Sequence, residues 1–340
     1  MKIGVLTGGG DCAGINGVIR GIVRRATDYH AEVVGIRRGW AGLMEPDIVP
    51  LAYDQVADII SLGGTILLTS RTNPFKKEGG AQLVMKNLGA AGVDALIAIG
   101  GEDTQGVAHK LAAFGLKAVG VPKTIDNDLS ETDVTFGFDT AVNVAVDAID
   151  RIRATGTSHE RVMVVEVMGR DAGWIATHSG IASGAHVILV PEEAFEVDAV
   201  CETVLARRKA GKNFTLIVVA EGARAKLREG QVTSSQGLDQ FGHPKLGGIG
   251  HYLAEEIEKG THLECRDVVL GHTLRGGPPL AFDRVLSTRL GVAAVDLVAE
   301  GKFDRMVALQ GNKIVDVSIG DAVKPKLVDR GLLEVGRLFS

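Results

Sequence analysis

The chain has 340 residues, of which 45% are hydrophobic and 23% charged, and this predicts a folded protein with two domains. Its net charge of −5 argues against a broad nucleic-acid-binding surface, and no apolar stretch reaches the ~18 residues that a membrane span needs. The three cysteines, Cys12, Cys201 and Cys265, are scattered and odd in number, which predicts free thiols and a cytoplasmic protein. Cys12 lies in a glycine loop, where it is either reactive or a small residue that the loop tolerates.

Short apolar runs rich in Val and Ile alternate with amphipathic segments along the chain. Runs that are apolar on both faces are typical of parallel strands covered by helices. Helical stripes run through Ile19, Val142–Ile152 and Ile249–Ile257, and the polar stretch Arg224–Leu246 predicts a loop with a small hairpin. The predicted fold is α/β, with two doubly wound, Rossmann-like domains and mostly parallel sheets. The expected strands are Ile3–Thr7, Val33–Ile36, Leu96–Ile99, Ala118–Val121, Val162–Val167, Val187–Val190, Leu216–Ala220 and Val268–Leu270.

The first strand is followed by a glycine loop, Gly8–Asn16, that opens a helix. Glycines let backbone N–H groups approach an anion, and a helix N-terminus favours negative charge. A tight turn is the alternative interpretation. The spacing matches neither the Walker pattern nor G-x-G-x-x-G, which argues against a nicotinamide dehydrogenase.

Two later strands end in charged segments, Gly100–Thr104 and Pro122–Asp128. Ligands of open α/β sheets bind at the carboxyl ends of strands, so Glu102, Asp103 and Lys123 are expected at one edge. Carboxylates beside a lysine indicate a metal, a phosphate and a proton to be moved. Thr104 as a helix cap and an Asn/Asp turn are the structural alternatives.

Further polar side chains follow the later strands. Phosphate is bound by arginine and histidine side chains, and glycine-framed turns present them at strand ends. A single histidine or a single surface arginine is more often structural. The prediction of a phosphate site therefore depends on finding several such residues together. The candidates are Arg71, Arg161, Met168, Gly169, Arg170, Glu221, Arg266, His272 and Arg275.

Taken in order, these motifs resemble the 6-phosphofructokinase family over nearly the whole chain. The strings PKTIDND, VVEVMGR and GHTLRGG are long and specific, and GGEDT is similar to the actinomycete-like branch of the pyrophosphate-dependent members. The resemblance implies phosphoryl transfer to fructose 6-phosphate with Mg²⁺, giving fructose 1,6-bisphosphate. It also implies a phosphoryl-donor-binding domain of residues 1–137 plus 274–324. The second implied domain binds the sugar phosphate and consists of residues 138–273 plus 325–340. The active site would lie in the cleft between the two domains.

The resemblance also implies a role for each candidate residue. Asp126 would be the general base, with Lys123, Arg170 and Thr124 as the other catalytic residues. Glu102 would bind Mg²⁺ at a position where the family usually has Asp. The expected donor-binding residues are Gly10, Arg71, Asp103 and Lys123. The expected sugar-phosphate-binding residues are Thr124, Asp126, Asp128, Arg161, Met168, Gly169, Arg170, Glu221, Arg266, His272 and Arg275. Arg161 and Arg266 would act across a subunit interface, which implies a homodimer or homotetramer.

The choice of phosphoryl donor depends on Asp103 and Lys123. ATP-using relatives have Gly at both positions, which leaves room for a nucleotide. Asp103 about 4 Å from a phosphate would cost on the order of 4 kcal/mol at an effective dielectric near 20. Pyrophosphate and a reversible reaction are therefore predicted, with an ATP-dependent enzyme as the alternative. A sugar-phosphate sensor is disfavoured because Asp126 and Glu102 are present. His186 stands where allosteric relatives have an acidic residue, so weak or absent allosteric control is expected.

Overall fold

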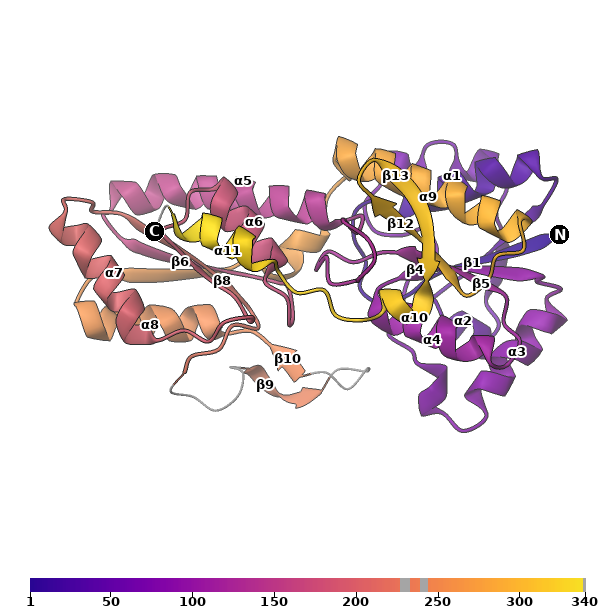
Figure 1. Ribbon diagram of the computed structural model, residues 1–340, viewed down its shortest axis with the longest axis horizontal. Coiled ribbons are helices and arrows are strands. Elements are labelled where there is room, and N and C mark those ends of the chain that lie inside the picture. The colour runs from indigo at the N-terminus through magenta and orange to yellow at the C-terminus, as the bar shows by residue number, and fades with distance from the viewer. Residues whose placement is uncertain (227–232, 239–243, 339–340) are drawn as a thin grey trace. The chain divides into compact units, whose positions relative to one another are not determined.

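The computed structural model describes residues 1–226, 233–238 and 244–338. The chain forms two compact units (Figure 1). Unit 1 consists of Met1–Thr140 and Arg275–Pro325, and unit 2 consists of Ala141–Leu274 and Lys326–Ser340. The predicted domain boundaries, where the chain passes from one domain to the other, follow residues 137, 273 and 324. No helix in the described ranges is long and apolar enough to cross a membrane.

Unit 1 is built on a seven-stranded sheet with the order β13-β12-β5-β4-β1-β2-β3. Its inner strands β12, β5, β4, β1 and β2 are parallel, whereas β13 and β3 pair antiparallel at the two edges. The strands are β1 Lys2–Thr7, β2 Glu32–Ile36, β3 Ile48–Pro50, β4 Ala95–Gly100, β5 Ala118–Pro122, β12 Arg305–Gln310 and β13 Lys313–Ser318.

Helices cover both faces of this sheet (Figure 1). Helices α1 and α9 pack together on one face, and α2, α3 and α4 bury Leu6, Ile36 and Leu96 on the other. Strands buried on both faces explain why their runs are continuously apolar. The helices are α1 Ile15–Asp28, α2 Ala41–Met44, α3 Gly80–Ala90, α4 Glu102–Ala112, α9 Ala281–Ala299 and α10 Ile319–Ala322. Short 3₁₀ turns are η1 Asp54–Val56, η2 Ile59–Ser61 and η3 Pro74–Lys76.

Unit 2 has a four-stranded parallel sheet with the order β11-β6-β8-β7. Helices α7 and α8 pack on one face over Val164, Ile217 and Val219, and α5, α6 and α11 lie over the other (Figure 1). The strands are β6 Val162–Val167, β7 Val187–Leu189, β8 Thr215–Ala220 and β11 Cys265–Val269. The helices are α5 Phe138–Ser158, α6 Trp174–Ala182, α7 Val197–Lys209, α8 Ile249–Thr261, η4 Gly271–Arg275 and α11 Arg330–Arg337.

The predicted fold class is confirmed, and each of the eight predicted strands is present within a few residues of its expected place. The last one is displaced, since β11 runs Cys265–Val269 rather than Val268–Leu270. Strands β3, β12 and β13 were not predicted; β12 and β13 form an antiparallel hairpin, and β3 pairs with β2 at the other edge of the sheet. The small hairpin predicted within Arg224–Leu246 is confirmed, since β9 Thr233–Leu238 and β10 Pro244–Leu246 pair antiparallel.

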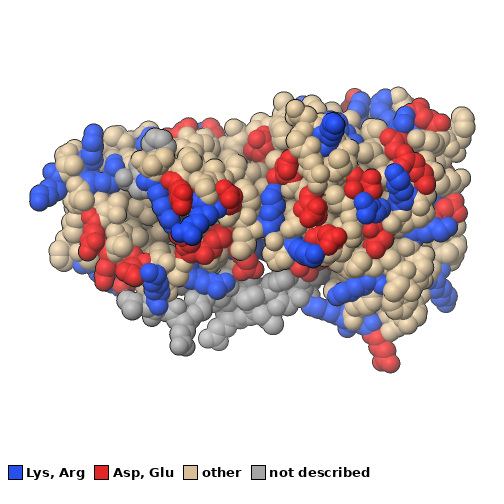
Figure 2. Space-filling view, viewed as in Figure 1, with Lys and Arg blue, Asp and Glu red and all other residues tan. Residues whose placement is uncertain are grey.

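On the face shown in Figure 2, acidic and basic side chains are interspersed over both units rather than gathered by sign. A nucleic-acid-binding surface is expected to show a basic stripe or patch. The mixture of signs on this face differs from such a stripe (Figure 2).

The parallel register brings several strand ends to one edge in each unit. In unit 1, Thr7 of β1 pairs with Ile99, and Gly100 of β4 pairs with Pro122 of β5. In unit 2, Val167 of β6 pairs with Ala220 of β8. The segments that follow these strands carry most of the predicted site residues.

Glycines allow α1 and α9 to pack closely in unit 1. A Cβ on Gly291 would lie 2.5 Å from the backbone oxygen of Val18, so Gly291→Ala forces the helices apart. We expect this variant to lose about 1–3 kcal/mol of unfolding free energy, as overpacked cores do. Gly106 of α4 is the matched control, since a Cβ there meets nothing within 4 Å. Gly106→Ala should be neutral or gain up to about 1 kcal/mol. Chemical denaturation measures both, and equal stabilities would contradict the close-packing argument.

Candidate active site

The first glycine loop is held to unit 1 by its backbone. The N–H of Gly8 donates to the Ile99 carbonyl oxygen (3.0 Å), and the N–H of Gly9 donates to that of Ser70 (3.0 Å). The Thr69 hydroxyl in turn donates to the carbonyl oxygen of Gly9 (2.6 Å). These bonds use the N–H groups of Gly8 and Gly9 inside the fold. Of the three loop glycines, Gly10 is therefore the one left as a candidate to contact the phosphoryl donor.

Two of the conspicuous glycines make room for Thr104. A Cβ on Gly8 would lie 2.5 Å from the Thr104 hydroxyl oxygen, and one on Gly100 would lie 2.3 Å from the Thr104 Cβ. The interpretation of Thr104 as a helix cap is wrong, because the N-cap of α4 is Gly101 and Thr104 is buried in the first turn. Close packing around Thr104 therefore explains Gly8 and Gly100 without a ligand.

Lys123 is the buried cation of this edge, with only 3% of its surface exposed. Its ammonium donates to the carbonyl oxygen of Gly10, and a Cβ on Gly9 would lie 3.5 Å from Nζ. Burial, with a smaller contribution from the positive charge of Arg275, lowers the pKa of Lys123 to about 8. The neighbouring groups that oppose this shift are Cys12, Asp126 and Asp11.

The turn after Lys123 positions a buried carboxylate. The Asp126 N–H donates to the Thr124 hydroxyl oxygen (3.0 Å), and that hydroxyl donates to Asp126 Oδ2 (3.4 Å). Thr135 supports the turn, since its hydroxyl donates to the Thr124 carbonyl oxygen (2.8 Å) and its N–H donates to Asn127 Oδ1 (3.0 Å). Asp126 is 5% exposed, and its Oδ1 accepts no hydrogen bond from the described residues. The turn therefore offers a fixed carboxylate oxygen that can accept a proton.

Arg275 lies against the first glycine loop. Its Nη1 donates to the Asp11 carbonyl oxygen (3.1 Å), and a Cβ on Gly10 would lie 2.7 Å from the same nitrogen. Arg275 and His272 both lie in η4, but Arg275 belongs to unit 1 and His272 belongs to unit 2. Gly10, Lys123, Thr124, Asp126 and Arg275 are referred to below as the unit 1 cluster.

Glu102 and Asp103 form the first turn of α4, at the same edge as the unit 1 cluster. Arg71 follows Ser70, whose carbonyl oxygen accepts from the Gly9 N–H, so Arg71 also lies beside the loop. Within the described ranges no three His, Cys, Asp or Glu side chains form a group that could hold a metal ion. Mg²⁺ commonly uses one or two carboxylates and takes its other ligands from substrate phosphates and water. An exposed Glu102 fits that kind of site.

Glu221 organises the corresponding edge of unit 2. Its Oε1 accepts from the N–H groups of Gly169 (3.3 Å) and Arg170 (3.2 Å). The left-handed backbone of Arg170 (φ 53°) packs so closely on Gly222 that a Cβ there would lie 1.9 Å from the Arg170 carbonyl oxygen. The resemblance implies that Glu221 binds the sugar phosphate, and this bracing of the loop was not predicted. Met168, Gly169, Arg170, Glu221 and His272 are referred to below as the unit 2 cluster.

Arg161 and Arg266 lie at the other end of the same sheet. Arg161 precedes β6, and Arg266 pairs with Met163 near the start of β6. Both contact the Glu264 carboxylate, at 2.8 Å from Arg161 and 2.5 Å from Arg266. Since β6 has six residues, about 20 Å of strand separates them from the unit 2 cluster. Within one chain these two arginines therefore do not join that cluster.

Cys12 is a buried thiol rather than a reactive one. Its side chain is 0% exposed and lies 3.8 Å from the Phe136 carbonyl oxygen. Burial raises the pKa of Cys12 to about 12, so almost no thiolate forms at neutral pH. All three cysteines are free and buried. The structural interpretation of Cys12 therefore holds.

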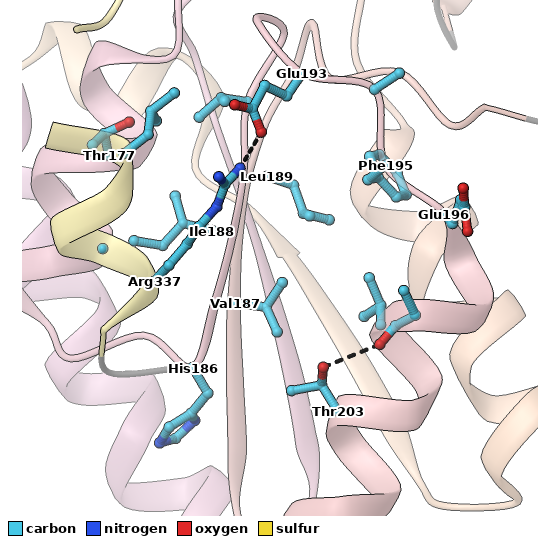
Figure 3. Close-up of a pocket in the computed structure, with 16 residues that line it drawn as sticks. Thr177, His186, Val187, Ile188, Leu189, Glu193, Phe195, Glu196, Thr203 and Arg337 are labelled. Atoms are coloured by element: carbon cyan, nitrogen blue, oxygen red, sulfur yellow. Dashed lines mark hydrogen bonds and ion pairs between the residues drawn. The ribbon is translucent and has the colours of Figure 1, made fainter. Parts of the chain in front are cut away.

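A pocket of about 290 Å³ opens in unit 2 beside β7 and contains none of the predicted site residues. Figure 3 shows Arg337 of α11 reaching toward Glu193 across this pocket, with His186 at one end. The His186 Nδ1 accepts from the Leu216 N–H (2.8 Å). Burial, then Arg207 and Arg153, lowers the pKa of His186 to about 4, so its ring is neutral at neutral pH.

Comparison with known proteins identifies the family of this chain. The model of the family described as Phosphofructokinase matches residues 2–298. The chain belongs to the phosphofructokinase family. A protein of Amycolatopsis methanolica named pyrophosphate–fructose 6-phosphate 1-phosphotransferase is 57% identical over 95% of this chain and 94% of its own length.

Two other similarities broaden the comparison. ATP-dependent 6-phosphofructokinase 3 of Streptomyces coelicolor is 50% identical and covers 95% of both chains. The solved phosphofructokinase of Saccharomyces cerevisiae superposes with a TM-score of 0.82 at 31% identity. It covers 95% of this chain, which spans 45% of the yeast chain. The family therefore includes relatives named for each of the two donors.

Proposed function

We propose that this phosphofructokinase transfers a phosphoryl group from pyrophosphate to the 1-hydroxyl of fructose 6-phosphate. The product is fructose 1,6-bisphosphate, and the reaction runs in both directions. The observation that carries the choice of donor is the buried ammonium of Lys123 on the carbonyl oxygen of Gly10. The 57% identical relative named for pyrophosphate supports the same choice. Three buried, free cysteines are consistent with a cytoplasmic location.

The side chains at the unit 1 edge favour a small donor over a nucleotide. Lys123 occupies the space beside Gly9 and Gly10 and supplies a positive charge to a phosphate placed there. Asp103, in the first turn of α4, would repel a further phosphate and the nucleotide attached to it. Arg71 beside the loop would add a second cation to the donor site. A lysine with little access to water interacts strongly with an anion, because few water molecules compete.

The unit 1 cluster also supplies the proton transfer. Asp126 would take the proton from the 1-hydroxyl as that oxygen attacks the phosphoryl group. Thr124 holds the carboxylate through its hydroxyl, and the Oδ1 atom is buried and available as an acceptor. Lys123 and Arg170 would stabilise the charge that spreads over the transferring phosphoryl oxygens.

Glu102 would hold Mg²⁺, with pyrophosphate oxygens and water as the remaining ligands. When bound, the ion would neutralise charge on the donor's phosphate oxygens. Asp103, the next residue of α4, would then stand beside the metal-bound donor and limit its size.

The sugar phosphate would bind to the unit 2 cluster together with Thr124, Asp126, Asp128 and Arg275. The loop Met168–Arg170, braced by Glu221, would contact the sugar, and His272 would bind its 6-phosphate. Arg161 and Arg266 would reach that phosphate from a second copy of the chain, since about 20 Å of β6 separates them from their own cluster. A homodimer or homotetramer follows from this assignment. With a neutral His186, we also propose weak or absent allosteric control.

The first test compares donors directly. Purified enzyme with fructose 6-phosphate and Mg²⁺ should turn over with pyrophosphate, and fructose 1,6-bisphosphate with phosphate should regenerate pyrophosphate. ATP should give at least tenfold lower kcat/KM, equivalent to about 1.4 kcal/mol or more. A coupled spectrophotometric assay measures each donor. Turnover with ATP and none with pyrophosphate would instead favour the ATP-dependent alternative.

Removal of the proposed base tests the role of Asp126. Asp126→Asn should lower kcat by about 10²–10⁴-fold, as the loss of a general base typically does. Binding of fructose 6-phosphate, measured by calorimetry, should survive. Asp94→Asn at the opposite edge of the unit 1 sheet is the control and should keep near-normal turnover. A near-normal rate for Asp126→Asn would reject the assignment.

The lowered pKa of Lys123 predicts a pH dependence. The cationic form binds pyrophosphate and predominates below about pH 8, so kcat/KM for pyrophosphate should fall as the pH rises through that value. Lys123→Arg keeps its charge throughout this range and should remove that limb of the profile. Initial rates from pH 6.5 to 9.5 at saturating fructose 6-phosphate measure both enzymes. Superimposable profiles would show that Lys123 does not titrate in the reaction.

A further inference from the structure

Glu166 is a buried carboxylate near the end of β6, two residues before Met168. It is 2% exposed, and none of the roles described above uses it. Its Oε2 accepts from the N–H groups of Gly250 (2.8 Å) and Gly248 (3.1 Å), and Oε1 lies 3.2 Å from the Gly248 nitrogen. Both N–H groups belong to the N-terminus of α8. The buried Glu166 carboxylate is therefore bound specifically by the start of that helix.

Helix α8 has no side-chain cap of its own, since its N-cap is Gly248 in a left-handed conformation (φ 87°). Glu166 from the neighbouring strand takes that place, and a carboxylate suits the positive end of the helix dipole. Gly250 permits the approach, because a Cβ there would lie 3.0 Å from the Glu166 Cβ and 3.1 Å from Oε2. Desolvation raises the pKa of Glu166 above its usual value, and the two backbone N–H groups offset only part of that rise.

The backbone of Glu166 connects the same point to η4. Its carbonyl oxygen accepts from the Leu270 N–H (3.0 Å), directly before the turn that carries His272. The start of α8 is also tied to β11, since His251 Nδ1 lies 3.3 Å from Asp267 Oδ1. One residue thus joins three segments: the strand that leads into Met168–Arg170, the first turn of α8, and the end of β11 before His272.

We propose that Glu166 is a positioning residue for the sugar phosphate, acting through the unit 2 cluster. Its carboxylate holds α8 against β6 and β11, and thereby fixes where β11 ends and where η4 places His272. This inference rests on the proposed function, because it assigns the unit 2 cluster to the sugar phosphate. At metal sites, residues that orient the binding groups in this way matter about tenfold or more for affinity, and an effect of similar size is expected here.

The test is selective weakening of fructose 6-phosphate binding. Glu166→Gln keeps the size of the side chain but removes its charge and turns an amide NH₂ toward backbone donors. The dissociation constant for fructose 6-phosphate, measured by calorimetry without any phosphoryl donor, should rise about tenfold. The KM for fructose 6-phosphate should rise similarly, and the KM for pyrophosphate should stay within about twofold.

Gly250→Ala perturbs the same contact from the helix side and serves where Glu166→Gln folds poorly. It keeps the charge of Glu166 and crowds its carboxylate, so a smaller rise of about threefold in the same constant is expected. Glu166→Asp keeps the charge on a shorter side chain and should fall between wild type and Glu166→Gln.

Asp283 provides the matched control in unit 1. It is 0% exposed and accepts from the N–H groups of Gly137 (2.8 Å) and Thr140 (2.9 Å) and from the Thr140 hydroxyl (2.5 Å). Asp283→Asn should lower Tm without changing the affinity for fructose 6-phosphate. Wild-type affinity in Glu166→Gln, or an equal loss in Asp283→Asn, would overturn the positioning role. No binding by the wild type would overturn the proposed function, and this inference with it.

Discussion

The parallel pairing of β1, β4 and β5 is the constraint on which the unit 1 cluster depends. Parallel strands run in the same direction, so their carboxyl ends meet at one edge and the segments that follow them converge. This is how the loop after Thr7, the first turn of α4 and the turn after Pro122 come together from separate positions along the first 128 residues. The pairing of β6, β8 and β11 has the same effect in unit 2.

Two cations at the unit 1 edge are held by the carbonyl oxygens of consecutive residues. Gly10 accepts from Lys123, and Asp11 accepts from Arg275. Burying a lysine costs free energy because its charge loses water, and the lowered pKa of Lys123 reflects that cost. Backbone oxygens offset only part of it. A bound anion would offset more, which is the physical reason for the proposal that pyrophosphate binds at this edge.

A glycine-rich loop after a strand indicates a phosphate site, but in this chain side-chain packing explains part of the pattern. Gly8 and Gly100 are needed because Thr104 packs against them, and the end of the Arg275 side chain lies close to Gly10. A glycine-rich segment after a strand indicates close approach, but the sequence does not say of what. The approaching groups come from distant parts of the chain, so only the packed structure identifies them.

Local sequence determined the strand ends and the residue types they carry. Apolar runs of Val and Ile predicted eight strands, and Lys123, Asp126 and Glu221 follow them as expected. Tertiary structure decided the rest, because the local pattern does not say which segments pack together. It added β3, β12 and β13, separated Arg161 and Arg266 from the unit 2 cluster by the length of β6, and joined Glu166 to α8. Periodicity reports which face of an element is buried, and only packing shows what lies against that face.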